Sequence, residues 1–245
     1  SEKEEHRKAA QKEHILANQF LLDATFNGEY SPETIHAINE ILSVNDSQFM
    51  TLEEDFLHLK EAAENIDFLG LNYYGSHFLK HYTGTSKIHH NGSGKKGSSI
   101  FALKGVGERV TNSAIPTTDW DWPIYPQGLE DMLLFIKKRY PNYKKIYITE
   151  NGLGSKDQFK DGQIIDDERI DYARLHLAAI LRASKQGIKV EGYFMWSLMD
   201  MFSWTNGYNK RYGLFYVDFE TQQRFPKKSA YWYKKISETK KLDQA

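Results

Sequence analysis

The chain has 245 residues, of which 40% are hydrophobic and 14% aromatic, and its formal net charge is -1 at pH 7. This composition indicates a globular chain with enough apolar material for a core. The balanced charge gives no footprint of nucleic-acid binding, and the zero cysteines exclude disulfides and thiolate metal sites. No apolar run approaches the length of a membrane span, and the charged stretch 1–20 shows no signal peptide.

The first part of the chain is predicted to be mainly helical. A helix is expected from about Glu4 to Leu22, and an amphipathic helical segment from Ala37 to Leu42. A strand is expected from Asp67 to Tyr73. The stretch from Tyr82 to Thr118 is rich in Gly, Ser and Lys, which is typical of a surface excursion and suits a mobile lid.

Two motifs inside this excursion look like ligand sites but are better explained without ligands. Gly92 to Ser98 resembles a phosphate-binding loop, yet it lacks the lysine after the last glycine, so we expect a flexible turn. His89 and His90 would point apart on a strand and have no partner at metal-binding spacing, so we expect an exposed pair.

Strands and helices alternate in the second half of the chain. This alternation is typical of a (β/α) barrel, and the whole of 1–245 is expected to form a single domain. The glycine at 187 is placed as a helix C-cap. The expected elements are strands at Lys145–Thr149 and Val190–Trp196 and helices at Glu130–Tyr140, Glu168–Gln186 and, opened by Pro226, through about Thr239.

Glu150 follows the strand Lys145–Thr149 and precedes the turn residues Asn151 and Gly152. The carboxyl end of a strand is the catalytic face of a (β/α) barrel. From this motif alone, a nucleophile and an ordinary strand-end glutamate that pairs with a neighbouring lysine are equally good interpretations.

A long aromatic loop, from Met201 to Gly213, follows the strand Val190–Trp196. Its aromatic residues alternate with Ser, Asn, Lys and Arg, so it offers flat apolar faces beside hydrogen-bond donors. Sugars need this mixture, since their rings stack on Trp while their hydroxyls require polar partners. The alternative is a packed loop that caps the barrel, and we expect Phe202 and Tyr208 to pack rather than to bind ligand.

Three segments, Asp67–Tyr74, Tyr147–Gly152 and Phe194–Leu198, resemble the signature of glycoside hydrolase family 1 and, within it, the 6-phospho-β-galactosidases. The likeness continues from about Asp23 to Lys235. It implies a (β/α)8 TIM barrel, of which this chain supplies the sixth, seventh and eighth strands. The chain would begin in the helix after the fifth strand, and the amino-terminal half of the barrel is the expected partner segment.

The resemblance also implies roles for individual residues. Glu150 would be the nucleophile of a retaining hydrolase, and Tyr74 would hydrogen-bond it. Trp122 would form the wall of the aglycone site and Trp196 the platform beneath the sugar. The catalysis implied needs no metal or cofactor. The residues expected to bind substrate are Asn72, Trp122, Trp196, Ser203, Trp204, Lys210 and Tyr212.

The aromatic loop indicates the subfamily. β-Glucosidases of this family carry a glutamate where this chain has Ser203, and a carboxylate would repel a phosphate. Ser203, Lys210 and Tyr212 match the family's phosphate-binding trio, in which one group neutralises charge and all three can hydrogen-bond. Trp204 favours galactose 6-phosphate over its gluco epimer, and dual specificity stays open. Without the serine, Lys210 would be interpreted as part of a solvated Lys-Arg pair.

The second carboxyl group of a retaining mechanism is absent from the sequence. In the family it belongs to a Thr-x-Asn-Glu-Pro motif, and the Asn39-Glu40 pair lacks the Thr and Pro, so Glu40 is assigned to a solvated helix face. The substrate implied is a phosphorylated disaccharide such as lactose 6-phosphate, which is made inside the cell and implies a cytoplasmic enzyme. The alternatives are a 6-phospho-β-glucosidase, a non-catalytic sugar-phosphate binding module and an inactive fragment.

Overall fold

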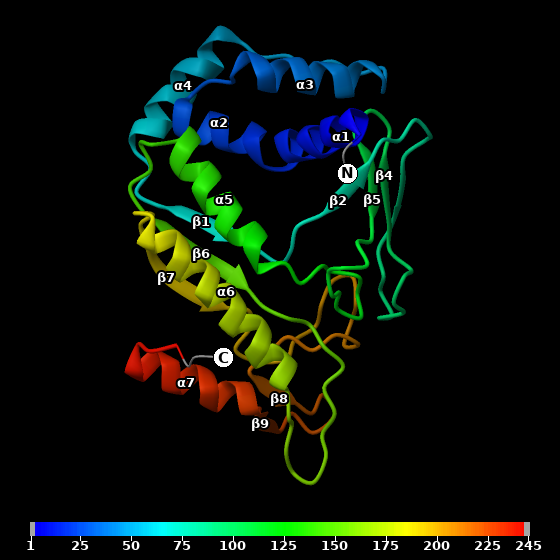
Figure 1. Cartoon of the computed structure of the whole chain (residues 1–245), viewed down its shortest axis with the longest axis vertical. Coiled ribbons are helices and arrows are strands. Elements are labelled where there is room, and N and C mark those ends of the chain that lie inside the picture. The colour runs from blue at the N-terminus through cyan, green and yellow to red at the C-terminus, as the bar shows by residue number, and fades with distance from the viewer. Residues whose placement is uncertain (1–2, 243–245) are drawn as a thin grey trace.

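A parallel sheet of three strands lies at the middle of the molecule (Figure 1). The computed structural model describes residues 3–242. The strands stand in the order β1-β6-β7 and are β1 (Leu69–Asn72), β6 (Ile146–Asn151) and β7 (Val190–Met195). All three predicted strands are confirmed, but β6 runs through Asn151, so Glu150 lies inside its carboxyl end and not after it.

One face of this sheet is buried beneath α5 (Pro126–Arg139) and α6 (Asp167–Lys185). Ile146 and Ile148 are two residues apart in β6, so they share a face, and both are fully buried. Burial of each such side chain stabilises the fold by about 1.5–3 kcal/mol. Their partners on the two helices include Leu129, Leu133, Ile136, Ile180 and Ala183.

The other face of the sheet carries large apolar side chains in the open. Phe68 is 51% exposed and Phe194 56% exposed, and Tyr147 lies between them with its ring centroid 5.3 Å from that of Phe68. Of the described strands, β6 alone has a neighbour on each side within this sheet. Three strands cannot close a barrel, so this part of the chain presents an open sheet with two unpaired edges.

The amino-terminal helix is longer than predicted and is interrupted. It consists of α1 (Glu4–His14), a π-helical turn η1 (Ile15–Gln19) and α2 (Phe20–Asn27). It ends at Gly28, whose φ of 64° is the left-handed conformation that glycine adopts at helix C-termini. Two further helices follow, α3 (Pro32–Ser43), with Ser31 as its N-cap, and α4 (Glu53–Glu64).

The excursion expected as a lid contains three strands of an antiparallel sheet that the sequence analysis did not predict. The four strands of this sheet stand in the order β2-β5-β4-β3 (Figure 1). Short runs of Ile, Phe, Val and Leu between glycines supplied a strand signal that the Gly and Ser content obscured. The strands are β2 (Phe78–Lys80), β3 (Lys87–His89), β4 (Ile100–Leu103) and β5 (Gly107–Val110).

The segment from Gly92 to Ser98 is held by side chains from its two flanks. The backbone N–H of Gly94 donates to Asn91 Oδ1 at 2.8 Å, and that of Gly97 donates to Asp121 Oδ1 at 2.5 Å. The backbone N–H of Ser99 donates to Asp121 Oδ2 at 3.0 Å, so the same carboxylate holds two positions at the end of this segment. His89 and its neighbour His90 are both exposed, as predicted.

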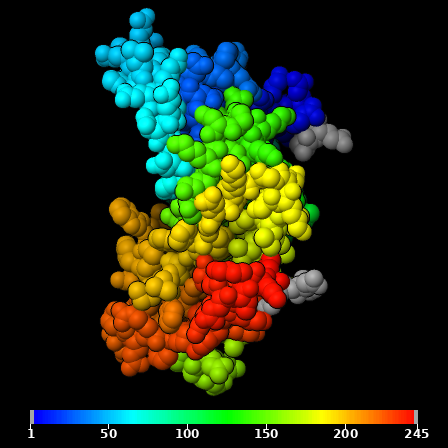
Figure 2. Space-filling model, turned by 90° about the vertical axis from the view of Figure 1, so that its left-hand side faces the viewer, coloured from blue at the N-terminus to red at the C-terminus, as the bar shows by residue number. Residues whose placement is uncertain are grey.

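The carboxyl-terminal part contains a hairpin and a helix, β8 (Phe215–Val217), β9 (Arg224–Pro226) and α7 (Lys228–Thr239). The prediction that Pro226 opens the last helix is wrong, because Pro226 pairs with Phe215 in the hairpin. A two-stranded edge tolerates proline, which cannot donate to the ladder. Figure 2 shows α4, α5, α6 and α7 succeeding one another along one side of the molecule.

The helices predicted at Glu130–Tyr140 and Glu168–Gln186 are confirmed as α5 and α6. α5 begins four residues earlier than predicted, with Pro126 at its first position, where the missing N–H of proline costs nothing. Within residues 3–242, no helix is long and apolar enough to cross a membrane.

Candidate active site

Glu150 and Tyr74 meet at the carboxyl ends of β6 and β1. The register of this parallel pair sets Asn72 beside Glu150, and the Tyr74 hydroxyl donates to Glu150 Oε2 at 2.8 Å. The Thr149 hydroxyl donates to Asn72 Oδ1 at 2.7 Å and ties the two strand ends together. Asn72, Tyr74 and Glu150, which the sequence analysis singled out, therefore lie close together, although Glu150 is more than 70 positions from the other two.

Tyr74 is a firmly protonated donor to this carboxylate. Burial raises the pKa of its hydroxyl, and the hydrogen bond to the negative charge of Glu150 raises the pKa further. The hydroxyl therefore keeps its proton at neutral pH and continues to orient the carboxylate. A half-buried carboxylate held in this way at a strand end is suited to nucleophilic attack.

Asn151, which the sequence indicated only as a turn residue, anchors β6 next to Glu150. It is fully buried, and its Nδ2 donates to the carbonyl of Tyr73 at 2.6 Å and to the hydroxyl of Tyr172 at 3.1 Å. The Tyr193 hydroxyl donates to its Oδ1 at 2.8 Å. Asn151 thus joins β1, α6 and β7 around the residue next to Glu150. Its position inside an apolar strand was the available signal, since buried amides need partners.

Lys210 lies in an enclosure of aromatic rings. Its Nζ is 3.3 Å from the centroid of the Trp122 ring, 5.0 Å from that of Trp120 and 5.1 Å from that of Tyr212. Trp122 in turn meets Tyr74 edge to face at 5.3 Å between centroids. Trp122 therefore contacts both Tyr74 and Lys210 and connects the two.

The ammonium group of Lys210 has no hydrogen-bond partner among the residues that the structure describes, although the side chain is fully buried. Burial lowers the pKa of Lys210 to about 7. The aromatic faces attract the cation but cannot replace its lost hydration. A buried cation in this state is stabilised by an anion with several acceptor oxygens.

Tyr212 lies beside Lys210, and Ser203 lies beside Tyr212. Burial raises the pKa of the Tyr212 hydroxyl to about 12, and a hydrogen bond with Ser203 acts in the opposite direction. Ser203 lies at the start of a turn that is closed by its N–H donating to the carbonyl of Gly207 at 2.8 Å. The three residues belong to one loop, and within residues 3–242 no carboxylate forms an ion pair or hydrogen bond with the Lys210 ammonium group.

The structure does not bring Trp204 into this group. The turn from Ser203 to Gly207 directs its indole outward, and the residue is 94% exposed. Trp196 lies at the end of β7, half-buried, with its N–H donating to the carbonyl of Asn151 at 2.9 Å. Phe202 and Tyr208 are also more than half exposed but pack against each other at 5.3 Å between centroids.

A buried ion network, which the sequence did not indicate, fixes the loops that carry these residues. Arg169 of α6 is fully buried and contacts Asp157 and Asp166 at 3.0 and 2.8 Å. Its Nη1 donates to the carbonyls of Leu153 and Tyr212, so that one guanidinium joins the loop after β6 to the aromatic loop. Lys227 and Arg211 extend the network to Asp200 at 2.8 and 2.7 Å.

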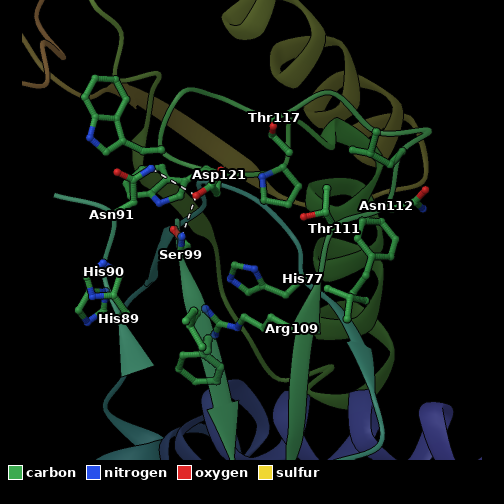
Figure 3. A pocket seen from close by; sticks show the side chains of 18 of the residues that line it. His77, His89, His90, Asn91, Ser99, Arg109, Thr111, Asn112, Thr117 and Asp121 are labelled. Carbon is green, nitrogen blue, oxygen red and sulfur yellow. Dashed lines mark hydrogen bonds between the residues drawn. The ribbon is translucent and has the colours of Figure 1, made fainter. Parts of the chain in front are cut away.

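A cavity of about 220 Å³ opens next to Lys210, between the aromatic residues and the antiparallel sheet. Figure 3 shows Asn91, Ser99 and Asp121 together at one side of it and His77 and Arg109 farther along. Trp120, Trp122 and Thr205 also line this cavity. The space joins the aromatic wall to polar groups, which is the chemistry that hydroxyl-rich ligands require.

Within the described range, no three His, Asp or Glu side chains are arranged to hold a metal ion. Glu40 lies in α3, exposed, and pairs with Lys12 at 3.2 Å, so its assignment to a helix face is confirmed. Retaining glycosidases have two carboxyl groups roughly 5 Å apart. Among the interactions of the described residues, none places a second carboxyl group opposite Glu150.

The parallel strands, the helices that connect them and the carboxylate at the end of the central strand are typical of the α/β class of proteins. The chain belongs to glycosyl hydrolase family 1, whose family model matches residues 1–242.

Relatives and solved structures agree with this assignment. A 6-phospho-beta-galactosidase from Clostridium acetobutylicum is 62% identical over 99% of this chain and 51% of its own length. One from Leptotrichia buccalis is 60% identical over 96% of this chain and 50% of its own length. A family 1 β-glucosidase from Thermotoga maritima superposes with a TM-score of 0.80 at 31% identity, over 100% of this chain and 49% of the other. The chain spans about half the length of the curated relatives it matches.

Proposed function

We propose that this chain forms the catalytic-nucleophile and phosphate-binding part of a retaining 6-phospho-β-galactosidase. In the complete protein its three strands would be the sixth to eighth of a single-domain (β/α)8 barrel. The observation that carries this proposal is Lys210, whose buried ammonium group has no hydrogen-bond partner among residues 3–242 and lies beside Tyr212, which in turn lies beside Ser203. A sugar phosphate supplies the acceptor oxygens and negative charge that this group lacks.

The chemistry would proceed in two displacements. Glu150 attacks the anomeric carbon, a carbon–oxygen bond forms, and the glycosidic bond breaks while an acid protonates the leaving oxygen. Water, deprotonated by the same group acting as a base, then attacks the anomeric carbon and releases Glu150. The acid would come from the part of the barrel outside this chain. Remote binding energy from the phosphate would hold the ring in place for attack.

The two curated relatives carry the name 6-phospho-beta-galactosidase, which supports the phosphorylated galactoside over its alternatives. Trp204 is exposed, so it does not decide between specificity for the phosphorylated galactoside, specificity for the gluco epimer and dual specificity. Kinetics with both epimers would distinguish these alternatives. A sugar phosphate made on entry into the cell implies a cytoplasmic enzyme. No metal or cofactor enters the proposed reaction.

The test is hydrolysis of nitrophenyl β-galactoside 6-phosphate, the unphosphorylated galactoside and the phosphorylated glucoside by the full-length enzyme that carries this sequence. A preference of at least about 100-fold for the phosphorylated galactoside over the plain one is expected from charge-assisted phosphate contacts. Equal turnover of the first two substrates would contradict the assignment of a phosphate site. Normal turnover by Glu150→Gln would contradict the assignment of Glu150 as the nucleophile.

A further inference from the structure

Gly154 lies four residues after Glu150, in the loop that leaves β6, and is buried against the side chain of Lys210. A methyl group added at Gly154 would stand 2.2 Å from Lys210 Cε, 2.7 Å from Cγ and 2.8 Å from Cδ. The three nearest atoms all belong to one lysine stem. Gly154 therefore forms the groove along which the lysine reaches its aromatic enclosure.

The backbone of Gly154 does not itself require glycine. Its φ lies outside the left-handed region, whereas Gly162 in the same β6–α6 connection has a φ of 78°. Gly152 is different again, since its added methyl would meet the carbonyl oxygen of Trp196. At Gly154 the space for the lysine stem is the reason for the missing side chain.

Hydrogen bonds hold the backbone next to Gly154 and the backbone next to Lys210 in place, so neither can move to make room for a larger residue at position 154. Ser155 and Arg211 pair in both directions, N–H to carbonyl, at 2.9 and 3.0 Å. Arg169 also bonds to the carbonyl of Leu153 and, at 2.6 Å, to the hydroxyl of Ser155. With the chain fixed on both sides of Gly154, an added methyl group must displace the flexible side chain of Lys210.

We infer that Gly154 is a positioning residue that determines specificity for the phosphorylated substrate, by leaving the channel through which Lys210 reaches the phosphate. The inference rests on the proposed function of Lys210 and adds a residue outside the trio. It gives the loop after β6 a second role, because this strand carries Glu150 near its carboxyl end and leads directly into the wall of the phosphate site.

The experiment is a double-mutant cycle in the full-length enzyme with Gly154→Ala, Lys210→Ala and the double variant. Gly154→Ala should lower kcat/KM for nitrophenyl β-galactoside 6-phosphate by about tenfold, mainly through KM, and leave the unphosphorylated galactoside nearly unchanged. Because Lys210→Ala removes the three atoms that the methyl would meet, Gly154→Ala should have no further effect on substrate preference or on the unfolding midpoint in that background.

Gly162→Ala is the matched control, since it adds the same methyl to the same loop with no atom within 4 Å. It should lower stability through its positive φ and leave substrate preference intact. An unchanged preference in Gly154→Ala, an equal loss on both substrates, or a loss of stability that persists in the Lys210→Ala background would overturn the inference. An unchanged preference in Lys210→Ala would instead overturn the proposed function.

Discussion

At the scale of single residues, the hydrogen bond from Tyr74 to Glu150 is the contact closest to the proposed chemistry. Tyr74→Phe removes this donor and keeps the ring that meets Trp122. Hydrogen bonds to charged groups are worth about 1.5–3 kcal/mol, so kcat should fall by about 10- to 100-fold. Steady-state hydrolysis of the phosphorylated galactoside measures this.

The control is Tyr208→Phe, which removes a hydroxyl from an exposed ring of the aromatic loop. Both variants should unfold at about the same urea concentration. If Tyr74→Phe hydrolysed the substrate as fast as Tyr208→Phe, the hydroxyl would have no part in orienting the nucleophile.

Lys210 predicts a pH dependence of substrate recognition. Burial lowers its pKa to about 7, so in the free enzyme the ammonium loses its proton as the pH rises through 7. A neutral amine holds a phosphate dianion weakly, and kcat/KM for the phosphorylated galactoside should decrease above pH 7. The ratio of this kcat/KM to that of the unphosphorylated galactoside isolates the effect above pH 7, because titrations of other enzyme groups act on both substrates and the substrate phosphate, with a second pKa of about 6, is already mostly dianionic there.

Lys210→Met keeps an apolar stem and removes the titrating group. In this variant the ratio should be low and constant above pH 7, where the substrate phosphate no longer titrates. A ratio that still decreased above pH 7 in Lys210→Met would assign the pH dependence to another group.

At the scale of secondary-structure elements, α6 connects the loops of the site through Arg169. The buried guanidinium pairs with Asp157 and Asp166 and bonds to the backbone of two loops. Arg169→Met leaves buried carboxylates with fewer partners, which costs about 3–5 kcal/mol of unfolding free energy. Urea unfolding of the full-length enzyme measures the loss.

Arg174→Met, on the same helix, is the matched control. Arg174 pairs with Asp171, which is 58% exposed, so its removal should cost less than about 1 kcal/mol. Equal losses for the two arginines would mean that the network does not hold the loops.

The strands and the two long helices could be predicted because their patterns are local. Alternating Ile and Tyr at 146–148 and the apolar stripe of α5 each encode one element within a few residues. The antiparallel sheet of the excursion was missed because its strands are three or four residues long and pair with partners up to about 30 positions away. Such pairs leave little periodic signal in the sequence.

At the scale of the whole molecule, the open face of the parallel sheet carries large apolar side chains that stay exposed in the described part of the chain. Phe68 and Phe194 are exposed on it, and β1 and β7 form its two edges. We expect the segment 1–245 expressed alone to bind a hydrophobic dye, and the same residues in the full-length protein not to do so. Amide hydrogen exchange in β1 and β7 should slow in the full-length protein by at least about tenfold.

Comparison with β6 provides the internal control, because β6 already has a neighbour on both sides. Its exchange should differ less between the two samples than that of the edge strands. Equal protection of β1, β6 and β7 in the isolated segment would show that it closes its own edges, for example by self-association.

The sequence by itself determined the three parallel strands, the nucleophile candidate at the end of the second strand, and a loop whose serine, lysine and tyrosine suit a phosphate. These features depend on local patterns and on residue types at short spacing. The packing of the elements shows that Lys210 is buried with no hydrogen-bond partner in the described range, that Trp204 is exposed, and that Gly154 borders the lysine stem. Burial and contact between distant loops depend on how the elements pack, and no local pattern encodes that packing.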